Sequence, residues 1–282
     1  MTTGRWSRPI ALTIAGSDSG GGAGIQADLK TFQAFGVYGA SVITAVTAQN
    51  TLGVRAVHEV PVEMIGAQID AVAEDLGADG VKTGMLSSAA IIEVVSDRIR
   101  HWGMQRTLVV DPVMVAKSGD RLLREDAVRA LLIHLVPLAA VLTPNVPEAE
   151  VLVGRSLETE HDLREAARTI HGMGARAVVM KGGHLAGDPV DLLFDGTSFH
   201  RFPAKRIDTP NTHGTGCTYS AAIAAGLSRG QTVLAAVSHA KAYLAGAIAR
   251  AVPTGHGHGP VLHEWTLLRQ PIASALSLLD AS

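Results

Sequence analysis

The chain repeats one local pattern along most of its length: a short apolar run, a turn, and then a longer segment with helical spacing. The runs at residues 10–15 and 107–112 are typical of strands that are buried on both faces. Strands that alternate with helices of about 10–15 residues form βαβ units, which build a parallel sheet covered by helices on both faces. We therefore expect one α/β domain without an internal linker. Its strands are expected at residues 10–15, 39–48, 80–85, 107–112, 140–143 and 177–180, with a hairpin at 190–194 and 199–202.

Composition excludes several classes of protein. The formal net charge is −2 and 4% of the residues are aromatic, so neither nucleic acid nor an anionic membrane is expected as a partner. The one cysteine cannot form an intramolecular disulfide, which favours a reducing, cytoplasmic location. Residues 1–9 lack the apolar core of a signal peptide. The most apolar helical segments, 221–227 and 233–248, are rich in alanine, and the second carries three polar residues, so they are expected to pack inside the protein.

Two glycine-rich segments precede predicted helices. Residues 16–24 read Gly-Ser-Asp-Ser-Gly-Gly-Gly-Ala-Gly and match neither a Walker phosphate loop nor a dinucleotide fingerprint, but they predict a ligand-facing loop. Residues 211–217 read Asn-Thr-His-Gly-Thr-Gly-Cys. The first N–H groups of a helix are unpaired and carry a partial positive charge, so the turn at 214–216 predicts an anion site. Cys217 would lie in the first helical turn, where the pKa of a thiol is lowered. An ordinary glycine-rich turn before a core helix is the alternative.

Polar or chemically distinctive side chains come directly after several of the predicted strands. In an open parallel sheet, ligands bind outside the carboxyl ends of the strands, so these side chains are expected along one edge. Each has an ordinary explanation when taken alone, because a strand-end acid often caps a helix and a methionine often fills a core. Together with the turn at 214–216, they favour acyl or phosphoryl transfer. The side chains are Asp18, Gln49, Met85, Asp111, Asn145 with Glu148, and Lys181.

Six motifs carry a family resemblance. They are Gly-Ser-Asp-Ser-Gly-Gly-Gly-Ala-Gly-Ile-Gln-Ala-Asp, Thr-Ala-Gln-Asn-Thr, Val-Val-Asp-Pro-Val-Met, Thr-Pro-Asn-x-x-Glu, Met-Lys-Gly-Gly-His and Asn-Thr-His-Gly-Thr-Gly-Cys. In this order they resemble the bacterial hydroxymethylpyrimidine/phosphomethylpyrimidine kinases of thiamine biosynthesis, in the ribokinase-like superfamily. The resemblance implies a ribokinase-like three-layer α/β/α sandwich with a mostly parallel central sheet and no separate large lid domain. It covers about residues 10–263 and leaves an N-terminal arm (1–9) and a C-terminal tail (264–282) outside the kinase domain.

The resemblance also implies an activity. It is the ATP-dependent phosphorylation of 4-amino-5-hydroxymethyl-2-methylpyrimidine and then of its monophosphate, with Mg²⁺ as cofactor and a homodimer as the assembly. The implied site places Gly214, Thr215, Gly216 and the base Cys217 at the transferred phosphoryl group; Lys181, Asn145, Gly182 and His213 at the nucleotide; Asp28, Gln49, Met85, Val113 and Gly16 at the pyrimidine; and Asp111 and Glu148 at the metal. Phosphoryl transfer depends mainly on positioning and charge neutralisation, which these residue types can supply.

Several alternatives remain open at this point. Cys217 replaces an aspartate that is usual in the wider superfamily, and it could shape the pocket instead of accepting a proton. His213 could relay a proton or lie in an exposed loop. The histidines at 256, 258 and 263 favour a loop that closes over the nucleotide rather than a metal site. The apolar face of the helix expected at 62–76 could serve a dimer or the core. Pyridoxal kinase is the competing activity, followed by a non-catalytic pyrimidine-binding protein; an NAD-dependent oxidoreductase would need the missing dinucleotide fingerprint.

Overall fold

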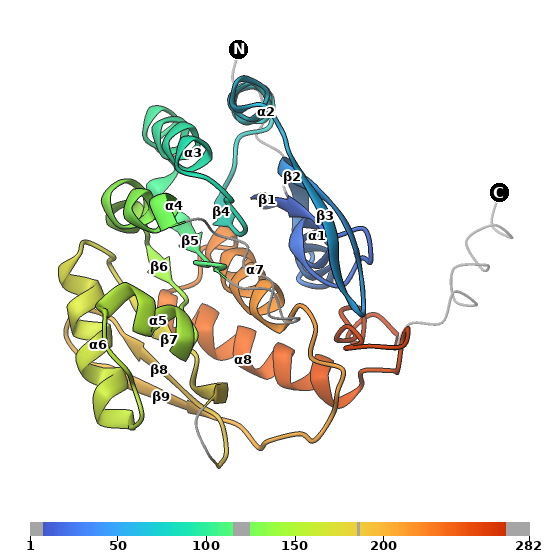
Figure 1. The fold of residues 1–282 in the computed structure, drawn as a ribbon, viewed down its shortest axis with the longest axis vertical. Coiled ribbons are helices and arrows are strands. Elements are labelled where there is room, and N and C mark those ends of the chain that lie inside the picture. The colour runs from blue at the N-terminus through green and yellow to red at the C-terminus, as the bar shows by residue number, and fades with distance from the viewer. Residues whose placement is uncertain (1–7, 115–124, 185–186, 269–282) are drawn as a thin grey trace, which may run out of the picture.

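The computed structural model describes residues 8–114, 125–184 and 187–268. Within these ranges, nine strands form one sheet in the order β3-β2-β1-β4-β5-β6-β7-β8-β9 (Figure 1). The strands are β1 (Ile10–Ser17), β2 (Tyr38–Asn50), β3 (Gly53–Glu59), β4 (Gly80–Thr83), β5 (Leu108–Val110), β6 (Val141–Leu142), β7 (Val178–Met180), β8 (Val190–Phe194) and β9 (Phe199–Pro203). The six strands from β2 to β7 pair in parallel, whereas β3, β8 and β9 pair antiparallel with their neighbours. The predicted mostly parallel sheet is confirmed.

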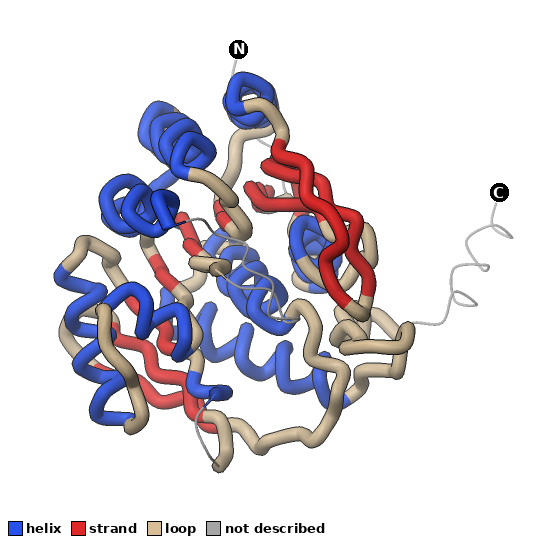
Figure 2. Tube along the Cα trace, in the orientation of Figure 1, coloured by secondary structure: helices blue, strands red, loops and turns tan. Residues whose placement is uncertain are grey.

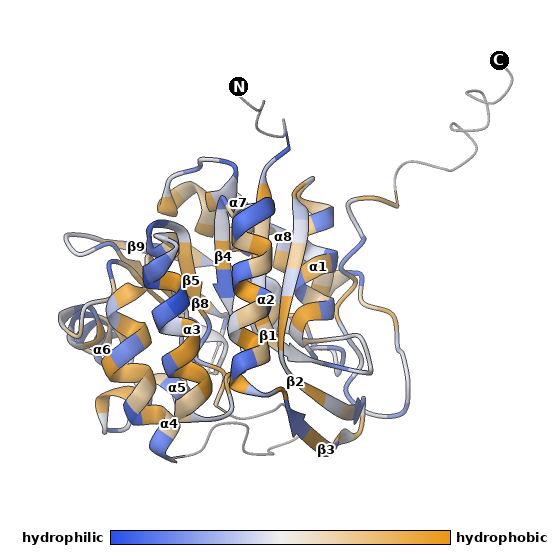
Figure 3. Ribbon diagram, turned by 90° about the horizontal axis from the view of Figure 1, so that it is seen from above, coloured by the Kyte–Doolittle hydropathy of each residue, from blue (hydrophilic) through white to orange (hydrophobic). Residues whose placement is uncertain are grey.

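Helices cover both faces of this sheet. One face packs against α1 (Gly24–Ala34), α7 (Thr215–Ser228) and α8 (Val233–Ala249). The other packs against α2 (Val62–Asp75), α3 (Ala89–His101), α4 (Glu125–Ala130), α5 (Val146–Val153) and α6 (Glu160–Gly172). The central strands consist mainly of buried apolar residues, and apolar and hydrophilic residues alternate along the helices (Figure 3). The predicted three-layer α/β/α architecture is therefore confirmed. No helix of the described residues is both long enough and apolar enough to cross a membrane.

Two local predictions differ from the structure. The β-rich run was expected to end at residue 48, but β2 continues to Asn50 and turns into β3, so that the two form a long hairpin at one edge of the sheet (Figure 2). β3 was missed because most of its side chains are exposed and it mixes valine with Arg55 and His58, which hides any buried face. The helix expected around residues 124–135 is α4 followed by a π-helical turn, Leu131–Leu135; residue 124 itself lies outside the described residues.

Candidate active site

The turn before α7 packs directly onto the first glycine-rich loop. Gly214 is the N-cap of α7 with φ 78°, a left-handed conformation that favours glycine. A Cβ atom at Gly214 would also overlap the carbonyl oxygen of Gly22. The backbone N–H groups at the start of α7 therefore lie against the loop that opens α1, although residues 22 and 214 are far apart in the sequence.

A side-chain contact joins the same two segments. The Asp18 carboxylate is buried and accepts hydrogen bonds from the N–H groups of Gly20, Gly22 and Ala23 at 2.8, 3.0 and 2.8 Å. The Nε2 atom of His213 lies 3.0 Å from Asp18 Oδ2 and 3.5 Å from Gln49 Nε2. Burial would raise the pKa of Asp18, but the hydrogen bonds from His213 and the backbone lower it overall. The side chain of His213, expected at the nucleotide, thus lies beside Asp18 and the substrate-side Gln49.

Three of the predicted nucleotide and metal residues form one charged cluster at the carboxyl ends of β5, β6 and β7. The Lys181 ammonium lies 3.0 Å from Asp111 Oδ1 and 3.7 Å from Glu148 Oε2. Asp111 also accepts from Ser220 at 3.1 Å, and Glu148 forms the capping box of α5 with Asn145. Burial raises the pKa of Glu148 to about 7, although Lys181 opposes the rise. The pKa of Asp111 is lowered because Lys181 and other donors outweigh its burial.

The cluster suits Mg²⁺ and the phosphates of ATP. No group of three or more His, Cys, Asp and Glu side chains in the described part of the chain could hold a metal ion. Two carboxylates, Asp111 and Glu148, do meet at Lys181, and Mg²⁺ is commonly held by one or two carboxylates together with substrate phosphates and water. Residues present therefore fit this metal.

Hydrogen bonds to residues that were not predicted from the sequence fix the position of the Lys181–Gly182 segment. Lys181 forms a backbone bridge with Asn145, and the N–H of Gly182 donates to Asp191 Oδ1 at 2.9 Å. Lys241 of α8 donates to the other oxygen of Asp191 at 2.6 Å. The side chain of Asp191 is buried, and its partner in α8 lies 50 residues away in sequence, so local patterns gave no sign of this contact.

The residues predicted for the pyrimidine do not all lie together. Gly16 faces Met85, because a Cβ atom at Gly16 would collide with the methyl group of Met85, and Met85 is nearly buried. Val113 follows Asp111 and is half-buried, as is Gln49. Asp28 is different: it is fully buried, its two oxygens accept from Lys82 at 3.0 and 2.8 Å, and Thr13 donates to it at 2.6 Å. Its predicted contact with the pyrimidine does not fit this placement.

Cys217 lies in the first turn of α7 and is half-buried. Its thiol pKa was expected to be lowered, yet burial raises it to about 11. The positive charge of Lys82 acts in the opposite direction but does not compensate. The expectation failed because the sequence shows the helix N-terminus and does not show how much protein surrounds the sulfur.

The C-terminal segment connects the hairpin to this site. Thr51, at the tip of the β2–β3 hairpin, accepts from the N–H groups of Gly257 and His258 at 3.2 and 2.9 Å. Pro260 then forms a parallel backbone bridge with His213. His263 is buried, with its Nε2 atom 3.0 Å from Thr218 Oγ1. The segment expected to close over a nucleotide therefore packs against the hairpin tip and the turn before α7.

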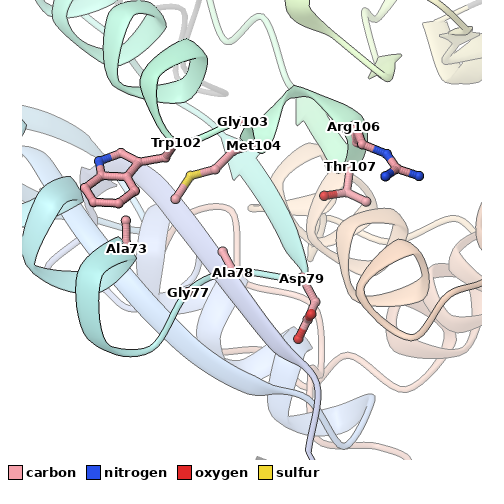
Figure 4. Close-up of a pocket in the computed structure, with 9 residues that line it drawn as sticks. All are labelled: Ala73, Gly77, Ala78, Asp79, Trp102, Gly103, Met104, Arg106 and Thr107. Carbon is pink, nitrogen blue, oxygen red and sulfur yellow. The ribbon is translucent and has the colours of Figure 1, made fainter. Parts of the chain in front are cut away.

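A separate cavity lies where β4 and β5 begin, at the edge of the sheet opposite these residues (Figure 4). Its volume is about 280 Å³, and its walls include Asp79, Trp102 and Arg106. None of the predicted site residues lines it. It is therefore not the candidate active site.

Known kinases resemble this chain over most of its length. A family model described as phosphomethylpyrimidine kinase matches residues 18–262. The hydroxymethylpyrimidine/phosphomethylpyrimidine kinase of Rhizobium meliloti is 57% identical over 262 residues, which cover 91% of this chain and 98% of that protein. The thiamine biosynthesis bifunctional protein ThiED of Geobacter sulfurreducens is 54% identical; the match covers 91% of this chain but only 52% of that longer protein. Among solved structures, an ADP complex of Bacillus subtilis pyridoxal kinase is 41% identical with a TM-score of 0.86, covering 93% of this chain and 100% of that one.

Proposed function

The chain belongs to the phosphomethylpyrimidine kinase family, and we propose a role in its reaction for each part of the site described above. The protein is a phosphotransferase of thiamine biosynthesis. It phosphorylates hydroxymethylpyrimidine and then the resulting monophosphate, with ATP as cosubstrate. The observation that carries the assignment of the site is that the α7 turn lies against the charged cluster: a Cβ atom at Gly216 would lie 3.5 Å from Lys181 Nζ and 3.6 Å from Asp111 Oδ2.

The phosphoryl transfer uses this edge in a simple way. The hydroxymethyl oxygen forms a bond to the γ-phosphorus as the bond from phosphorus to the β,γ-bridging oxygen breaks, and ADP leaves with the electron pair. The N–H groups of Thr215, Gly216 and the residues beside them stabilise the charge that develops on the transferred group. Lys181 leaves Asp111 and Glu148 and neutralises the ATP phosphates as a point charge. Asp111 and Glu148 would hold Mg²⁺, and the bound ion would supply further charge neutralisation on the phosphates.

Cys217 accepts the proton of the hydroxymethyl group in this proposal. Because the pKa of the thiol is about 11 in the empty protein, only a small fraction is thiolate at neutral pH. A loose phosphoryl transition state requires little removal of the proton before the new bond forms. A small thiolate fraction is therefore sufficient if the sulfur lies within hydrogen-bond distance of the hydroxymethyl group. In the second reaction an oxygen of the monophosphate is the nucleophile and no such proton needs to be removed at neutral pH.

The pyrimidine lies between the first glycine-rich loop and the segment after β5. Gln49 offers both an amide donor and an amide acceptor to the ring nitrogen and the amino group. Met85 and Val113 form apolar walls, and Gly16 leaves room beside Met85. His213 holds the loop through Asp18 and is within reach of Gln49.

The protein works as a homodimer through the β2–β3 hairpin. Val46, Leu52 and Val57 are 45, 61 and 45% exposed. Val46 pairs with His58 and Val57 with Thr47, so the two valines lie on opposite faces of the hairpin. β3 is also an edge strand, and a second copy that pairs with it would cover this edge. We further place the protein in the reducing cytoplasm, which suits its single thiol.

A mass-resolved assay tests the function. The purified protein is incubated with ATP and Mg²⁺ and offered hydroxymethylpyrimidine or pyridoxal in parallel. Monophosphate followed by diphosphate from the pyrimidine is the expected result. Pyridoxal kinase is the second candidate because the solved pyridoxal kinase is 41% identical, and pyridoxal phosphate without any pyrimidine product would replace the proposed substrate. No product from either compound, with pyrimidine binding retained, would identify a non-catalytic binding protein.

A further inference from the structure

Asp191 and Lys241 form an ion pair that has no role in the chemistry described so far. Asp191 lies on β8 and Lys241 on α8, and only 4% and 13% of their side-chain surfaces are exposed. The Lys241 ammonium donates to Asp191 Oδ2 at 2.6 Å. A buried pair of this kind adds little net stability, because the cost of removing both charges from water offsets their attraction. The contact of the other carboxylate oxygen indicates a different role.

That oxygen holds the peptide group that follows Lys181. Asp191 Oδ1 accepts the N–H of Gly182 at 2.9 Å, and this N–H shares a peptide group with the carbonyl of Lys181. On the other side, the N–H of Lys181 donates to the carbonyl of Pro144 at 2.9 Å. Because each peptide group is planar, the two hydrogen bonds fix both groups that flank the Cα atom of Lys181. The side chain of Lys181 therefore starts from a fixed position and in a fixed direction.

Gly182 fits closely against β8. A Cβ atom at this position would overlap the carbonyl oxygen of Val190, so a residue with a side chain could not approach the strand in this way. Gly182 was expected at the nucleotide, and its N–H is bonded to Asp191. Gly182 thus contributes to the site through the position that it gives to Lys181.

The ammonium of Lys181 lies between the two parts of the candidate site. It is 3.0 Å from Asp111 Oδ1 and 3.7 Å from Glu148 Oε2. A Cβ atom at Gly216 would lie 3.5 Å from the ammonium, which therefore also lies against the turn that opens α7. A lysine side chain loses much conformational freedom when its ammonium is held in one place. A fixed backbone at its base reduces the freedom that the binding of a phosphate has to remove.

We propose that Asp191, held by Lys241, is a positioning residue that places the Lys181 ammonium for the phosphates of ATP through the N–H of Gly182. The proposal rests on the proposed function, since it concerns how that site holds its nucleotide. Asp191 supplies the acceptor. Lys241 keeps the carboxylate in place and compensates its buried charge. Neither residue has to touch the nucleotide or the pyrimidine in this role.

Two paired variants separate the acceptor from the charges. Asp191→Asn with Lys241→Met, the acceptor-keeping pair, removes both charges and retains a side-chain oxygen for the Gly182 N–H. Asp191→Leu with Lys241→Met, the acceptor-free pair, removes both charges and the acceptor but has a side chain of similar shape. Both pairs avoid an unpaired buried charge. The measurement is the Kd of a non-hydrolysable ATP analogue in the presence of Mg²⁺, by titration calorimetry on the whole protein without pyrimidine.

The acceptor-free pair should bind the analogue about tenfold more weakly than the native protein, as for the loss of one hydrogen bond to a charged group. The acceptor-keeping pair should bind it as tightly as the native protein does. Equal losses in the two pairs, or no loss in either, would overturn the proposal. Urea unfolding identifies a variant that does not fold. In that case Asp191→Ala with Lys241→Met, which also lacks the acceptor, replaces the acceptor-free pair with the same expectation.

A Lys181→Met background separates positioning from a general loss of structure. Because Asp191 acts through Lys181 in the proposal, the acceptor-free pair should cause no further loss of affinity when the Lys181 ammonium is already absent. A structural defect would weaken binding in both backgrounds. The same loss in the Lys181→Met background as in the native one would therefore contradict the positioning role.

Turnover distinguishes the failure of this proposal from the failure of the proposed function. If the native protein binds the analogue but makes no phosphorylated pyrimidine, while the variants lose affinity as expected, the proposed function fails and the positioning role stands. If the native protein makes the product and the acceptor-free pair binds normally, the positioning role alone fails. A native protein that does not bind the analogue would overturn both.

Discussion

Replacement of Glu148 by glutamine should stabilise the protein in the absence of ligands, and the gain should grow as pH rises from 4.5 to about 7. The Glu148 carboxyl is buried, accepts the N–H of Asn145 at 2.8 Å, and lies 3.7 Å from the Lys181 ammonium. Burial raises its pKa from 4.5 to about 7, and the neighbouring Asp111 adds to the rise. Glutamine keeps a side-chain oxygen for the Asn145 N–H and removes the buried charge.

The size of the effect follows from proton linkage. An acid with a higher pKa in the folded state binds more protons when folded, so its contribution to stability falls as pH rises from 4.5 to about 7 and is constant above. At about 1.4 kcal/mol per pKa unit, the ionised Glu148 costs about 3 kcal/mol of unfolding free energy above pH 7. We expect Glu148→Gln to gain about 2–3 kcal/mol more at pH 8.5 than at pH 5.

Urea unfolding of the protein without nucleotide or metal measures this difference at both pH values. Glu158→Gln, at an exposed position in the segment after α5, is the matched control and should show no pH-dependent gain. An equal change for Glu148→Gln at pH 5 and pH 8.5 would refute the argument that burial of the charge is the cause. The same variant should lose its Mg²⁺-dependent activity, because one of two carboxylates at the proposed metal position is gone.

Three further predictions concern the turn before α7 and the loop that it contacts. Gly214→Ala should destabilise the protein by at least about 2 kcal/mol in urea unfolding, because a Cβ atom would adopt a positive φ and meet the Gly22 carbonyl; a stable alanine variant would contradict this packing. In the native enzyme, kcat should rise with pH towards about 11 as Cys217 ionises, and Cys217→Ser should lose this rise together with about 100-fold in kcat; serine with nearly full kcat would exclude the thiolate as base. His213 and backbone donors lower the pKa of Asp18 against the effect of burial, so its carboxylate stabilises the fold above the unfolded pKa of about 3.8, and this stability is lost as pH falls through the folded pKa. The unfolding free energy of Asp18→Asn should therefore fall less steeply with acid than that of the native protein. An unchanged dependence of the unfolding free energy on pH below about 4 would contradict the assignment.

The sheet could be predicted because it depends on local patterns. Buried parallel strands such as β1 and β5 are continuous apolar runs, and the helices between them keep one apolar face. The hairpin strand β3 escaped prediction because its residues are exposed and take their strand conformation from pairing with β2. Gly53, at the turn between two valine-rich segments, is the sequence feature from which β3 could have been predicted.

The electrostatics of the site could not be predicted in the same way. Lys82 lies in a four-residue strand where a lysine would ordinarily mark an exposed edge, and its partner Asp28 is 54 residues away. The family resemblance assigned Asp28 to the pyrimidine, whereas in the structure its carboxylate accepts from Lys82 and Thr13. The thiol pKa of Cys217 depends on the surrounding protein, which only the folded chain defines.

The hydrogen bonds from the hairpin tip to the C-terminal segment have a consequence for cooperativity. Thr51 holds Gly257 and His258, and Pro260 of the same segment is bridged to His213, one residue before the turn that opens α7. A second copy that orders the hairpin would therefore also order the turn, and a ligand that orders the turn would tighten the association of the two copies. Thermodynamic reciprocity requires the two effects to be equal in free energy. The dissociation constant of such a dimer, measured with and without bound nucleotide, would then differ by the free energy that couples the hairpin to the active-site turn.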